Sequence, residues 1–314
     1  MRLSVPAKIN LHLRVGPRRE DGFHPLMTWM VTVGLFDTLE LKNVESTGGG
    51  WADGSAGSLT LATSDPALPV DARNLVVRAA SALADARRRR VGEGPQTGKR
   101  ASAFLTKRIP SGAGLGGGSS DAASTLMGLN RMWDAGLNAI ELAQIGATLG
   151  SDVPFFFHGP SSICTGRGEV VRPIGVPRAR WALLVMPRVG VSTAAAYGAF
   201  DRMGQTGLQW GKDEAVGNEP DWSEWVGLES SSLLPRLVND LEPAAFAVQP
   251  LVGELRTSLE MKLNRPVRMS GSGSTLFTLY DTAEQAKHAV RNIGAIDARV
   301  EAVEIAPQTE SAPI

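Results

Sequence analysis

The chain begins with a regular alternation of apolar and polar positions. Within residues 3–15, the polar residues Lys8, Asn10, His12 and Arg14 alternate with apolar residues. A period of two predicts a half-buried strand. Lys8 and Asn10 are two residues apart, so their side chains should lie on one face of it. Residues 27–44 continue the strand pattern, with a break expected near Gly34.

Helical spacing follows further along the chain. Residues 74–89 are amphipathic, and Asn74 is a good N-cap for them. Apolar residues at 122, 126, 129 and 133 recur at helical spacing, and Asn138 with Glu141 predicts a capping box that opens the next helix. The other expected elements are strands over 100–109 and 179–187, a hairpin over 161–174, helices over 233–247, 250–262 and 283–293, and a strand, loop and strand over 267–280.

These elements mix without strict strand–helix alternation, which favours an α+β fold over a doubly wound sheet. A length of 314 residues suits two domains. Prolines at 173 and 177 precede a fresh strand. We therefore expect an N-terminal domain over 1–177, a C-terminal domain over 178–306 and a disordered tail over 307–314.

The segment 204–232 does not fit this scheme. It carries three of the seven tryptophans without clear periodicity. It fits a lid, an insertion or a surface loop with an anchoring tryptophan.

Composition narrows the classes of function. The chain has 32 basic and 32 acidic residues, so its net charge favours neither nucleic acid nor an anionic membrane as a partner. The run Arg87–Arg90 fits a solvated helix end. The single cysteine, Cys164, excludes an internal disulfide, fits the core and favours a reducing compartment, so we expect a cytoplasmic protein. The four histidines lack metal-ligand spacing, and no apolar run is long enough to span a membrane.

The stretch RIPSGAGLGGGSSDAAS, residues 108–124, contains five glycines. Gly112, Gly114 and Gly117 match G-x-G-x-x-G, but the region about twenty residues on, where a dinucleotide fold has an acidic residue at a strand end, is the helix end around Asp134. Gly118 and Ser119 stand where a Walker A loop has Lys and Ser or Thr, and the protein-kinase motifs are absent. A glycine loop that opens a helix still offers bare N–H groups to an anion, most naturally a nucleotide phosphate. The alternative is a flexible linker.

Four further features allow either a functional or a structural interpretation. Asp152 follows Gly150 and precedes Pro154, which also fits an ordinary turn. Lys8 could be a charge that protects an edge strand. The segment DGFH, residues 21–24, could be a hairpin turn, and MSGSGST, residues 269–275, could contain a bulge.

In chain order, PAKINL, DGFH, IPSGAGLGGGSSDAA, LGSDVPFFFHG and SGSGSTLF resemble the GHMP kinase superfamily. The resemblance covers most of residues 1–305. The glycine motif is typical of the whole superfamily. The combination of PAKINL, DGFH and GSDVPFF is more specific, and resembles the member that phosphorylates the 2-hydroxyl of a cytidine diphosphate-linked methylerythritol in the non-mevalonate route to isoprenoid precursors.

The resemblance implies a ribosomal-S5-like N-terminal domain, a ferredoxin-like C-terminal domain, and ATP with Mg²⁺ in the cleft between them. It implies catalysis by Lys8 and Asp152. It assigns ATP binding to Asn74, Lys107, Pro110, Ser111, Gly112, Ala113, Gly114, Leu115, Gly116, Gly117, Gly118, Ser119 and Ser120. It assigns substrate binding to Asn10, Phe23, His24, Asp152, Thr193, Tyr197, Gly271 and Ser272.

In this scheme Phe23 and Tyr197 stack on cytosine and His24 reads its edge; Phe23 stands where Tyr is commoner in the family. Mg²⁺ is held mainly by ATP phosphates, with Ser119 or Ser120 as a further contact, and no protein-built metal site is expected. The protein would be a monomer or homodimer without nucleic-acid or membrane partners. The alternatives are another small-molecule kinase of the superfamily, of the homoserine or mevalonate type, and a non-catalytic RNA-binding module.

Overall fold

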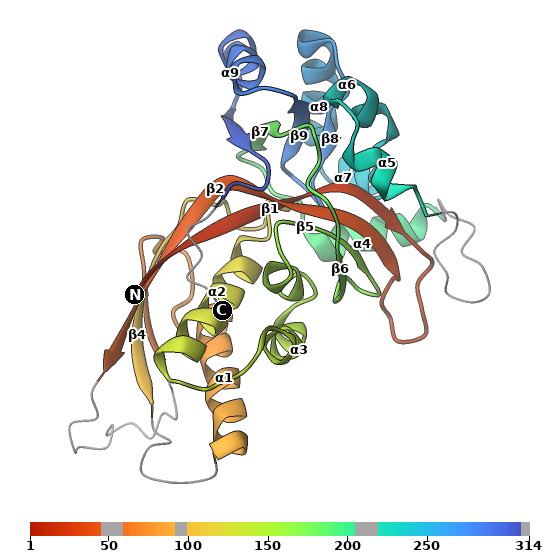
Figure 1. Ribbon diagram of the computed structural model, residues 1–314. Helices are drawn as coiled ribbons and strands as arrows, with labels where there is room; N and C mark the ends of the chain where they lie inside the picture. Colours follow the sequence, from red (N-terminus) through yellow and green to blue (C-terminus); the bar gives the residue numbers. More distant parts are fainter. Residues whose placement is uncertain (45–58, 92–98, 205–218, 309–314) are drawn as a thin grey trace.

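A computed structural model describes all residues except 45–58, 92–98, 205–218 and 309–314 (Figure 1). The strands are β1 (Arg2–Val15), β2 (Leu26–Val44), β3 (Leu59–Thr63), β4 (Arg100–Thr106), β5 (Ser161–Thr165), β6 (Val170–Pro173), β7 (Trp181–Pro187), β8 (Arg268–Met269), β9 (Leu276–Tyr280) and β10 (Ala298–Glu304). The helices are α1 (Leu75–Val91), α2 (Gly117–Met132), α3 (Ala139–Leu149), α4 (Thr193–Arg202), α5 (Trp222–Val226), α6 (Ser230–Leu233), α7 (Glu242–Val248), α8 (Pro250–Leu263) and α9 (Ala283–Asn292), with 3₁₀ turns η1 (Pro154–Phe157) and η2 (Leu234–Arg236).

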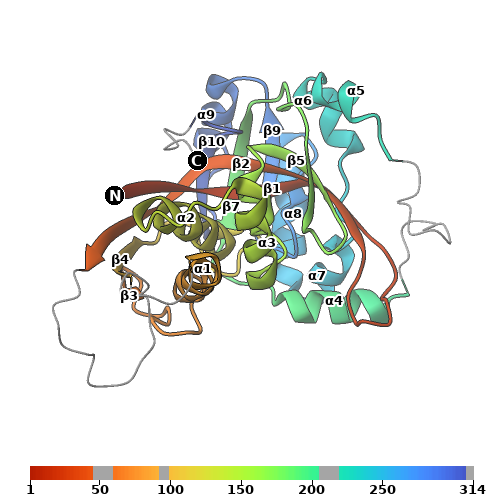
Figure 2. The same cartoon turned by 60° about the horizontal axis from the view of Figure 1, so that its bottom comes forward.

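The strands form two sheets. The N-terminal sheet has the order β3-β4-β2-β5-β6, with β1 paired to β2, and α1, α2 and α3 pack side by side against it (Figure 2). The C-terminal sheet has the order β10-β7-β9-β8 and is antiparallel throughout. A β-α-β-β-α-β chain with this order is ferredoxin-like. The predicted α+β fold with two sheet units is therefore confirmed.

One hydrophobic cluster joins the two sheets. Ile9 and Trp29 of the first sheet lie in the same buried cluster as Leu184 and Phe277 of the second. The chain after β10 also returns to the first sheet, because the Ala306 N–H donates to the carbonyl of Thr32 in β2 over 2.8 Å. The predicted boundary between residues 177 and 178 falls in the connection between β6 and β7.

The prediction of a half-buried first strand is wrong. The polar side chains Lys8, Asn10 and His12 are buried as well as their apolar neighbours. The glycine-rich loop covers Lys8, and the rings of Trp222 and Trp225 lie against His12. Both faces of β1 are thus covered, because the strand lies between the glycine-rich loop and the C-terminal half of the protein.

The expected break near Gly34 is also wrong, since β2 continues to Val44. The register instead jumps from Pro6 opposite Phe36 to Ala7 opposite Val33, which is a bulge. A Cβ at Gly34 would lie 3.4 Å from the backbone nitrogen of Glu304. The glycine therefore permits close approach of the C-terminal segment, rather than ending the strand.

The single helix expected over 233–247 is wrong too. Instead the chain forms α6 and η2, extends, and begins α7 at Glu242. The N–H of Leu13 donates to the carbonyl of Val238 over 2.9 Å, and Asn239 pairs with Leu13 in a parallel bridge. Pairing with β1 thus replaces helix at these residues. Helix forms only on either side of them, in α6 and α7.

The arginine run, the single cysteine and the tryptophan-rich segment can now be placed. Arg87 is buried and donates to the carbonyl of Trp133, so only the remainder of the Arg87–Arg90 run is a solvated helix end. Cys164 is buried in the core as expected. Trp222 is buried against Trp29, while residues 205–218 of the tryptophan-rich segment and 309–314 of the tail lie outside the described residues. Within the described part of the chain, no helix combines the length and apolar character that crossing a membrane requires.

Candidate active site

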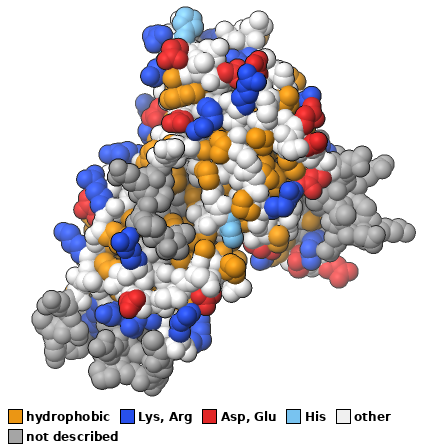
Figure 3. Space-filling view, in the orientation of Figure 1, with side chains coloured by type: hydrophobic (Ala, Val, Ile, Leu, Met, Phe, Trp, Pro, Cys, Tyr) orange, Lys and Arg blue, Asp and Glu red, His pale blue; other side chains and the backbone are white. Residues whose placement is uncertain are grey.

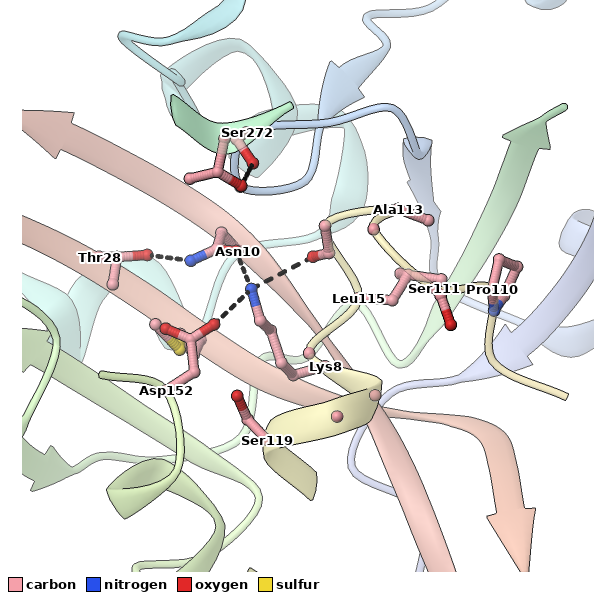
Figure 4. A pocket seen from close by; sticks show the side chains of 18 of the residues that line it. Lys8, Asn10, Thr28, Pro110, Ser111, Ala113, Leu115, Ser119, Asp152 and Ser272 are labelled. Carbon is pink, nitrogen blue, oxygen red and sulfur yellow. Dashed lines mark hydrogen bonds and ion pairs between the residues drawn. The ribbon is translucent and has the colours of Figure 1, made fainter. Parts of the chain in front are cut away.

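A cavity of about 320 Å³ lies between the two halves of the protein. The glycine-rich loop and the start of α2 form one wall, and α4 with the loop 270–274 forms the other. Lys8 and Asp152 lie on its floor (Figure 4). The lining residues are Lys8, Asn10, Leu13, Leu26, Thr28, Met30, Leu75, Lys107, Pro110 to Ser119, Asp152, Thr193, Tyr197, Leu241, Gly271 and Ser272.

The ammonium group of Lys8 is the centre of the polar contacts. Its Nζ donates to Oδ1 of Asn10 over 2.5 Å and to the carbonyl of Gly114 over 3.2 Å. It also lies 3.2 Å from Oδ2 of Asp152. An ammonium has three N–H groups, so these three acceptors fix its position and direction.

Asn10 is held as firmly as Lys8. Its Nδ2 donates to the Thr28 hydroxyl over 2.8 Å, and that hydroxyl donates to the carbonyl of His12 over 2.7 Å. The Asn10 backbone N–H donates to the Ser270 hydroxyl over 3.1 Å. The side-chain amide is therefore oriented by its partners, with its oxygen toward Lys8 and its nitrogen toward β2 (Figure 4).

Asp152 combines an ion pair with access to the cavity. It lies in the turn between α3 and η1, and Pro154 begins the 3₁₀ turn after it. Its side chain is 32% exposed, whereas that of Lys8 is 4% exposed. A carboxylate in this position can accept a proton from a group in the cavity while the buried ammonium keeps it in place.

Three glycines of the glycine-rich loop adopt a positive φ. Gly112, Gly114 and Gly116 have φ values of 67°, 77° and 65°, which favour glycine. A Cβ at Gly114 would lie 2.2 Å from the carbonyl oxygen of Ser270, and one at Gly116 would lie 2.8 Å from Cγ of Lys8. A Cβ at Gly112 would meet no atom within 4 Å. Two of the glycines thus make room for the protein itself.

The N-terminus of α2 opens into the cavity. Gly116 occupies the N-cap position without a side-chain cap, and the first turn carries no acidic residue. Gly117 and Ser119 line the cavity there. Free N–H groups and the positive end of the helix dipole make this a favourable site for an anion.

Lys107 lies below the loop between two buried carboxylates. Its Nζ forms ion pairs with Asp37 and, at 2.9 Å, with Asp121. Burial alone would lower the pKa of Lys107, but the charges of Asp121 and Asp37 outweigh it and raise that pKa. Burial raises the pKa of Asp121 to about 7; Lys107 opposes this shift and Asp37 adds to it. Asp37 also accepts the backbone N–H groups of Arg108 and Ile109 at the start of the loop.

Aromatic side chains gather at the far end of the cavity. Tyr197 lines it, and burial raises the pKa of the Tyr197 hydroxyl to about 12, with the charge of Asp152 adding to the shift. The ring of His24 lies 5.2 Å from that of Tyr197. Phe23 is exposed, with the Arg167 guanidinium 4.8 Å from its ring centre.

Both ring nitrogens of His24 have protein partners. Nδ1 lies 2.9 Å from the carbonyl of Gly16, and Nε2 lies 3.1 Å from Oδ1 of Asp201. Both ring nitrogens are therefore occupied by protein groups. These contacts tie the β1–β2 hairpin to α4.

Most of the candidate residues named from the sequence line this one cavity, and four do not. Asn74 caps α1, because its Oδ1 accepts from the Val76 N–H over 2.9 Å. Ser120 is buried and lines a second cavity instead, on the other side of α2. His24 lies against Tyr197 and Phe23 is exposed on the β1–β2 hairpin, and neither lines the cavity. Thr193 and Ser272 face each other across the opening, with their hydroxyls 2.8 Å apart.

Three further residues build this site, and only Ser270 lies in a segment that the sequence singled out. Thr28 orients Asn10, Ser270 joins Asn10 to the glycine-rich loop, and Asn239 binds the loop that carries Gly271. Ser270 lies in the second glycine motif, which was a usable signal. Thr28 and Asn239 carried none, because their role depends on strand pairing distant in sequence.

The residues present suit a metal ion held mainly by phosphate. Among the residues that the structure describes, no three His, Cys, Asp or Glu side chains form a cluster that could hold a metal. Ser119 and Asp152 both face the cavity and could supply oxygen contacts to an ion that arrives with a nucleotide.

Comparison with known proteins gives matches over both halves of the chain. The family model for the GHMP kinases N terminal domain matches residues 74–160, and that for GHMP kinases C terminal matches 218–296. A 4-diphosphocytidyl-2-C-methyl-D-erythritol kinase of Brevibacillus brevis is 37% identical, covering 89% of this chain and 88% of the relative.

Solved structures agree with this match. The crystal structure of a 4-(cytidine 5'-diphospho)-2C-methyl-D-erythritol kinase is 31% identical, with a TM-score of 0.73, and covers 98% of this chain and all of that one. A homoserine kinase from Cytophaga hutchinsonii has a TM-score of 0.66 at 17% identity, covering 97% of this chain and 94% of that one, which shows a shared fold alone.

Proposed function

The chain belongs to the GHMP kinases and, within them, to the 4-diphosphocytidyl-2-C-methyl-D-erythritol kinase family, and we propose that Lys8 and Asp152 carry its catalysis. It is an ATP-dependent small-molecule kinase of isoprenoid precursor biosynthesis. The observation that supports the proposal is the Lys8–Asp152 ion pair, 3.2 Å long, in one cavity with the uncapped start of α2.

In the proposed reaction, the 2-hydroxyl oxygen of the substrate attacks the γ-phosphorus of ATP. The hydroxyl proton passes to the Asp152 carboxylate, the bond from phosphorus to the bridging oxygen breaks, and ADP leaves. The Lys8 ammonium, fixed by Asn10 and the Gly114 carbonyl, neutralises negative charge near the transferred group. Phosphoryl transfer requires mainly such positioning and charge neutralisation.

We place the phosphates of ATP at the glycine-rich loop and the first turn of α2. The open side of Gly112 and the uncapped N–H groups near Gly117 support this assignment. Mg²⁺ bound to those phosphates would neutralise part of their charge, and Ser119, which lines the cavity, could supply a further oxygen contact. Lys107 acts here by fixing the loop from below, since both of its ion pairs are with protein carboxylates.

We place the cytosine ring near Tyr197, whose side chain lines the cavity beside Leu26. Phe23 would supply the second face after Arg167 moves from its ring. His24 would bring the hairpin backbone to the edge of the base, because its own ring nitrogens face Gly16 and Asp201.

We propose a cytoplasmic protein that acts as a monomer or homodimer on this small-molecule substrate. Basic and acidic side chains are interspersed on the face in Figure 3, and the totals are equal at 32 each. A basic surface is the usual footprint of an RNA-binding module, so these charges favour the kinase over that alternative.

The test is an ADP-release assay with three acceptors side by side: the cytidine diphosphate-linked methylerythritol, homoserine and mevalonate. We expect turnover with the first alone. Lys8→Met and Asp152→Asn should each lower kcat by about 10²-fold or more while leaving the fold intact, the usual contribution of a positioned base or charge. Near-normal turnover of a folded Asp152→Asn protein would falsify the role of Asp152.

A further inference from the structure

We propose that Asn239 is a positioning residue for this reaction, because it fixes the loop 270–274 over Lys8 and Asn10. The inference rests on the proposed catalytic role of Lys8. Asn239 contacts neither of the two proposed catalytic side chains in the hydrogen bonds that the structure describes. It acts through the backbone of the loop.

Asn239 is buried, and both ends of its side-chain amide are occupied. Nδ2 donates to the carbonyl of Met269 and to the carbonyl of Gly271, each over 2.8 Å. Oδ1 accepts from the N–H of Leu241 over 2.9 Å. Two carbonyls two residues apart in the loop are thus bound by one nitrogen, which sets the path of the chain between them.

The neighbours of Asn239 tie the same segment to both halves of the protein. Oδ2 of Asp240 accepts from Nε of Arg14 and from the Val15 N–H, each over 3.0 Å. Oε1 of Glu242 accepts from the Met269 N–H over 2.8 Å. The segment Asn239–Glu242 therefore joins the end of β1 to the loop that faces the cavity.

The loop in turn touches the residues of the proposed chemistry. The Ser270 hydroxyl accepts from the Asn10 N–H and donates to the carbonyl of Gly114 over 2.9 Å. A Cβ at Gly271 would lie 3.1 Å from Oδ1 of Asn10 and 3.6 Å from Nζ of Lys8. A small movement of this backbone would displace both side chains, and displacements near 1 Å can lower turnover by about 10²-fold.

Asparagine is the residue that this place requires. Its amide supplies two N–H donors and one acceptor in a short side chain. Asn239→Asp keeps the shape but turns an oxygen toward two carbonyl oxygens, so that the two donor bonds are lost and the loop is repelled. Glu242→Gln, by contrast, retains the acceptor for the Met269 N–H and should change kcat by less than about threefold.

The matched control is Asn130, which binds backbone in the same manner away from the cavity. Its Nδ2 donates to the carbonyl of Leu137 over 2.9 Å, and its Oδ1 accepts from the Leu137 N–H over 3.1 Å. Asn130→Asp should lower Tm and leave kcat within about twofold of the wild type. Asn239→Asp should lower kcat by about 10²-fold with both substrates saturating.

Both variants are assayed for ADP release with the acceptor that the wild-type protein phosphorylates. If the proposed substrate is wrong, the wild-type protein will phosphorylate a different alcohol. The two variants can then be compared with that alcohol instead. If Asn239→Asp does not fold, Asn239→Ala is measured, with at least a tenfold loss of kcat expected. The loss should also be non-additive with that of Ser270→Ala. A folded Asn239 variant with kcat within twofold of Asn130→Asp, or strict additivity with Ser270→Ala, overturns the proposal.

Discussion

The two glycine-rich loops of the cavity rest on different kinds of support. The loop 110–116 lies above Lys107, Asp37 and Asp121, a buried ammonium between two carboxylates. The loop 270–274 lies on the neutral amide of Asn239. A charged support responds to pH and a neutral one does not, so the two walls should differ in how conditions affect them.

The loops also use glycine for different neighbours. Gly114 meets the carbonyl of Ser270 in the opposite loop, whereas Gly112 faces open space. The sequence predicted an anion site for the glycine-rich loop as a whole and did not separate its glycines. In the structure Gly114 is required by the contact between the two loops. A substitution at Gly114 therefore does not test ATP binding, whereas one at Gly112 does.

Gly114→Ala should have the largest effect on stability. Its φ of 77° disfavours an L-residue by about 1–2 kcal/mol, and a Cβ 2.2 Å from a backbone oxygen adds an overpacking cost of about 1–3 kcal/mol. We expect unfolding in urea to show a loss of about 2–5 kcal/mol, together with loss of turnover. Wild-type stability in this variant would mean that the two loops can move apart without cost. The contact between Gly114 and Ser270 would then not contribute to stability.

Asp121→Asn should change how stability depends on pH. The carboxyl has its pKa raised from 3.8 to about 7 in the folded protein, so its contribution is fully present below about pH 4 and is lost as pH rises through about 7. Between pH 5 and pH 8 the wild-type free energy of unfolding should fall by about 2–3 kcal/mol from this group. Asp121→Asn should not show this decrease in the free energy of unfolding.

Urea unfolding of both proteins at several pH values measures the difference. Asn239→Ala serves as the control. It removes a neutral amide, so the free energy of unfolding should depend on pH as it does in the wild-type protein. Equal slopes in wild type and Asp121→Asn would show that the carboxyl stays ionised throughout, and the contrast between charged and neutral support would fail.

Ser270→Ala should have a smaller effect, since it removes only the hydroxyl that joins the loops. That hydroxyl bonds the Asn10 N–H and the carbonyl of Gly114, and a typical hydrogen bond contributes about 0.5–1.5 kcal/mol. We expect a loss of about 1–2 kcal/mol in stability and about tenfold in kcat. Thr193→Ala removes an exposed bond to Ser272 and should cost less in both measurements; the reverse ranking would contradict the role of Ser270.

Much of the fold could be predicted from local pattern. The capping box at Asn138 and Glu141 is present, with donor–acceptor distances of 2.8 and 3.0 Å, and Asn74 caps α1. Such signals lie within a few residues of each other. The two-domain α+β architecture and the kinase family were also predicted, from motifs spread along the chain, and are confirmed.

The errors arose where distant segments decide the local structure. The polar face of β1 is buried because Trp222 and Trp225 cover His12, and burial lowers the pKa of that imidazole to about 3, with Arg14 adding to the shift. The chain at Asn239 leaves helical geometry to pair with Leu13. The strand β10 was missed although Arg299 and Glu301 alternate with apolar neighbours, because it is an edge strand whose partner β7 lies far earlier in the chain. No window of a few residues contains this information.

Gly112→Ala should cost less stability than Gly114→Ala, and the pair separates backbone strain from contact between the loops. Its φ of 67° resembles that of Gly114, but its Cβ would meet no atom within 4 Å. Strain alone then costs about 1–2 kcal/mol, and Gly112→Asn, which tolerates this conformation better, should cost less. Because Gly112 lines the cavity, the added methyl group should raise the KM for ATP while the KM for the cytidine substrate stays within twofold. Urea unfolding gives the first quantity and steady-state kinetics the second. A loss of stability as large as that of Gly114→Ala would show that conformation, rather than contact between the loops, explains both glycines; an unchanged KM for ATP would move the phosphates away from Gly112 and toward the first turn of α2.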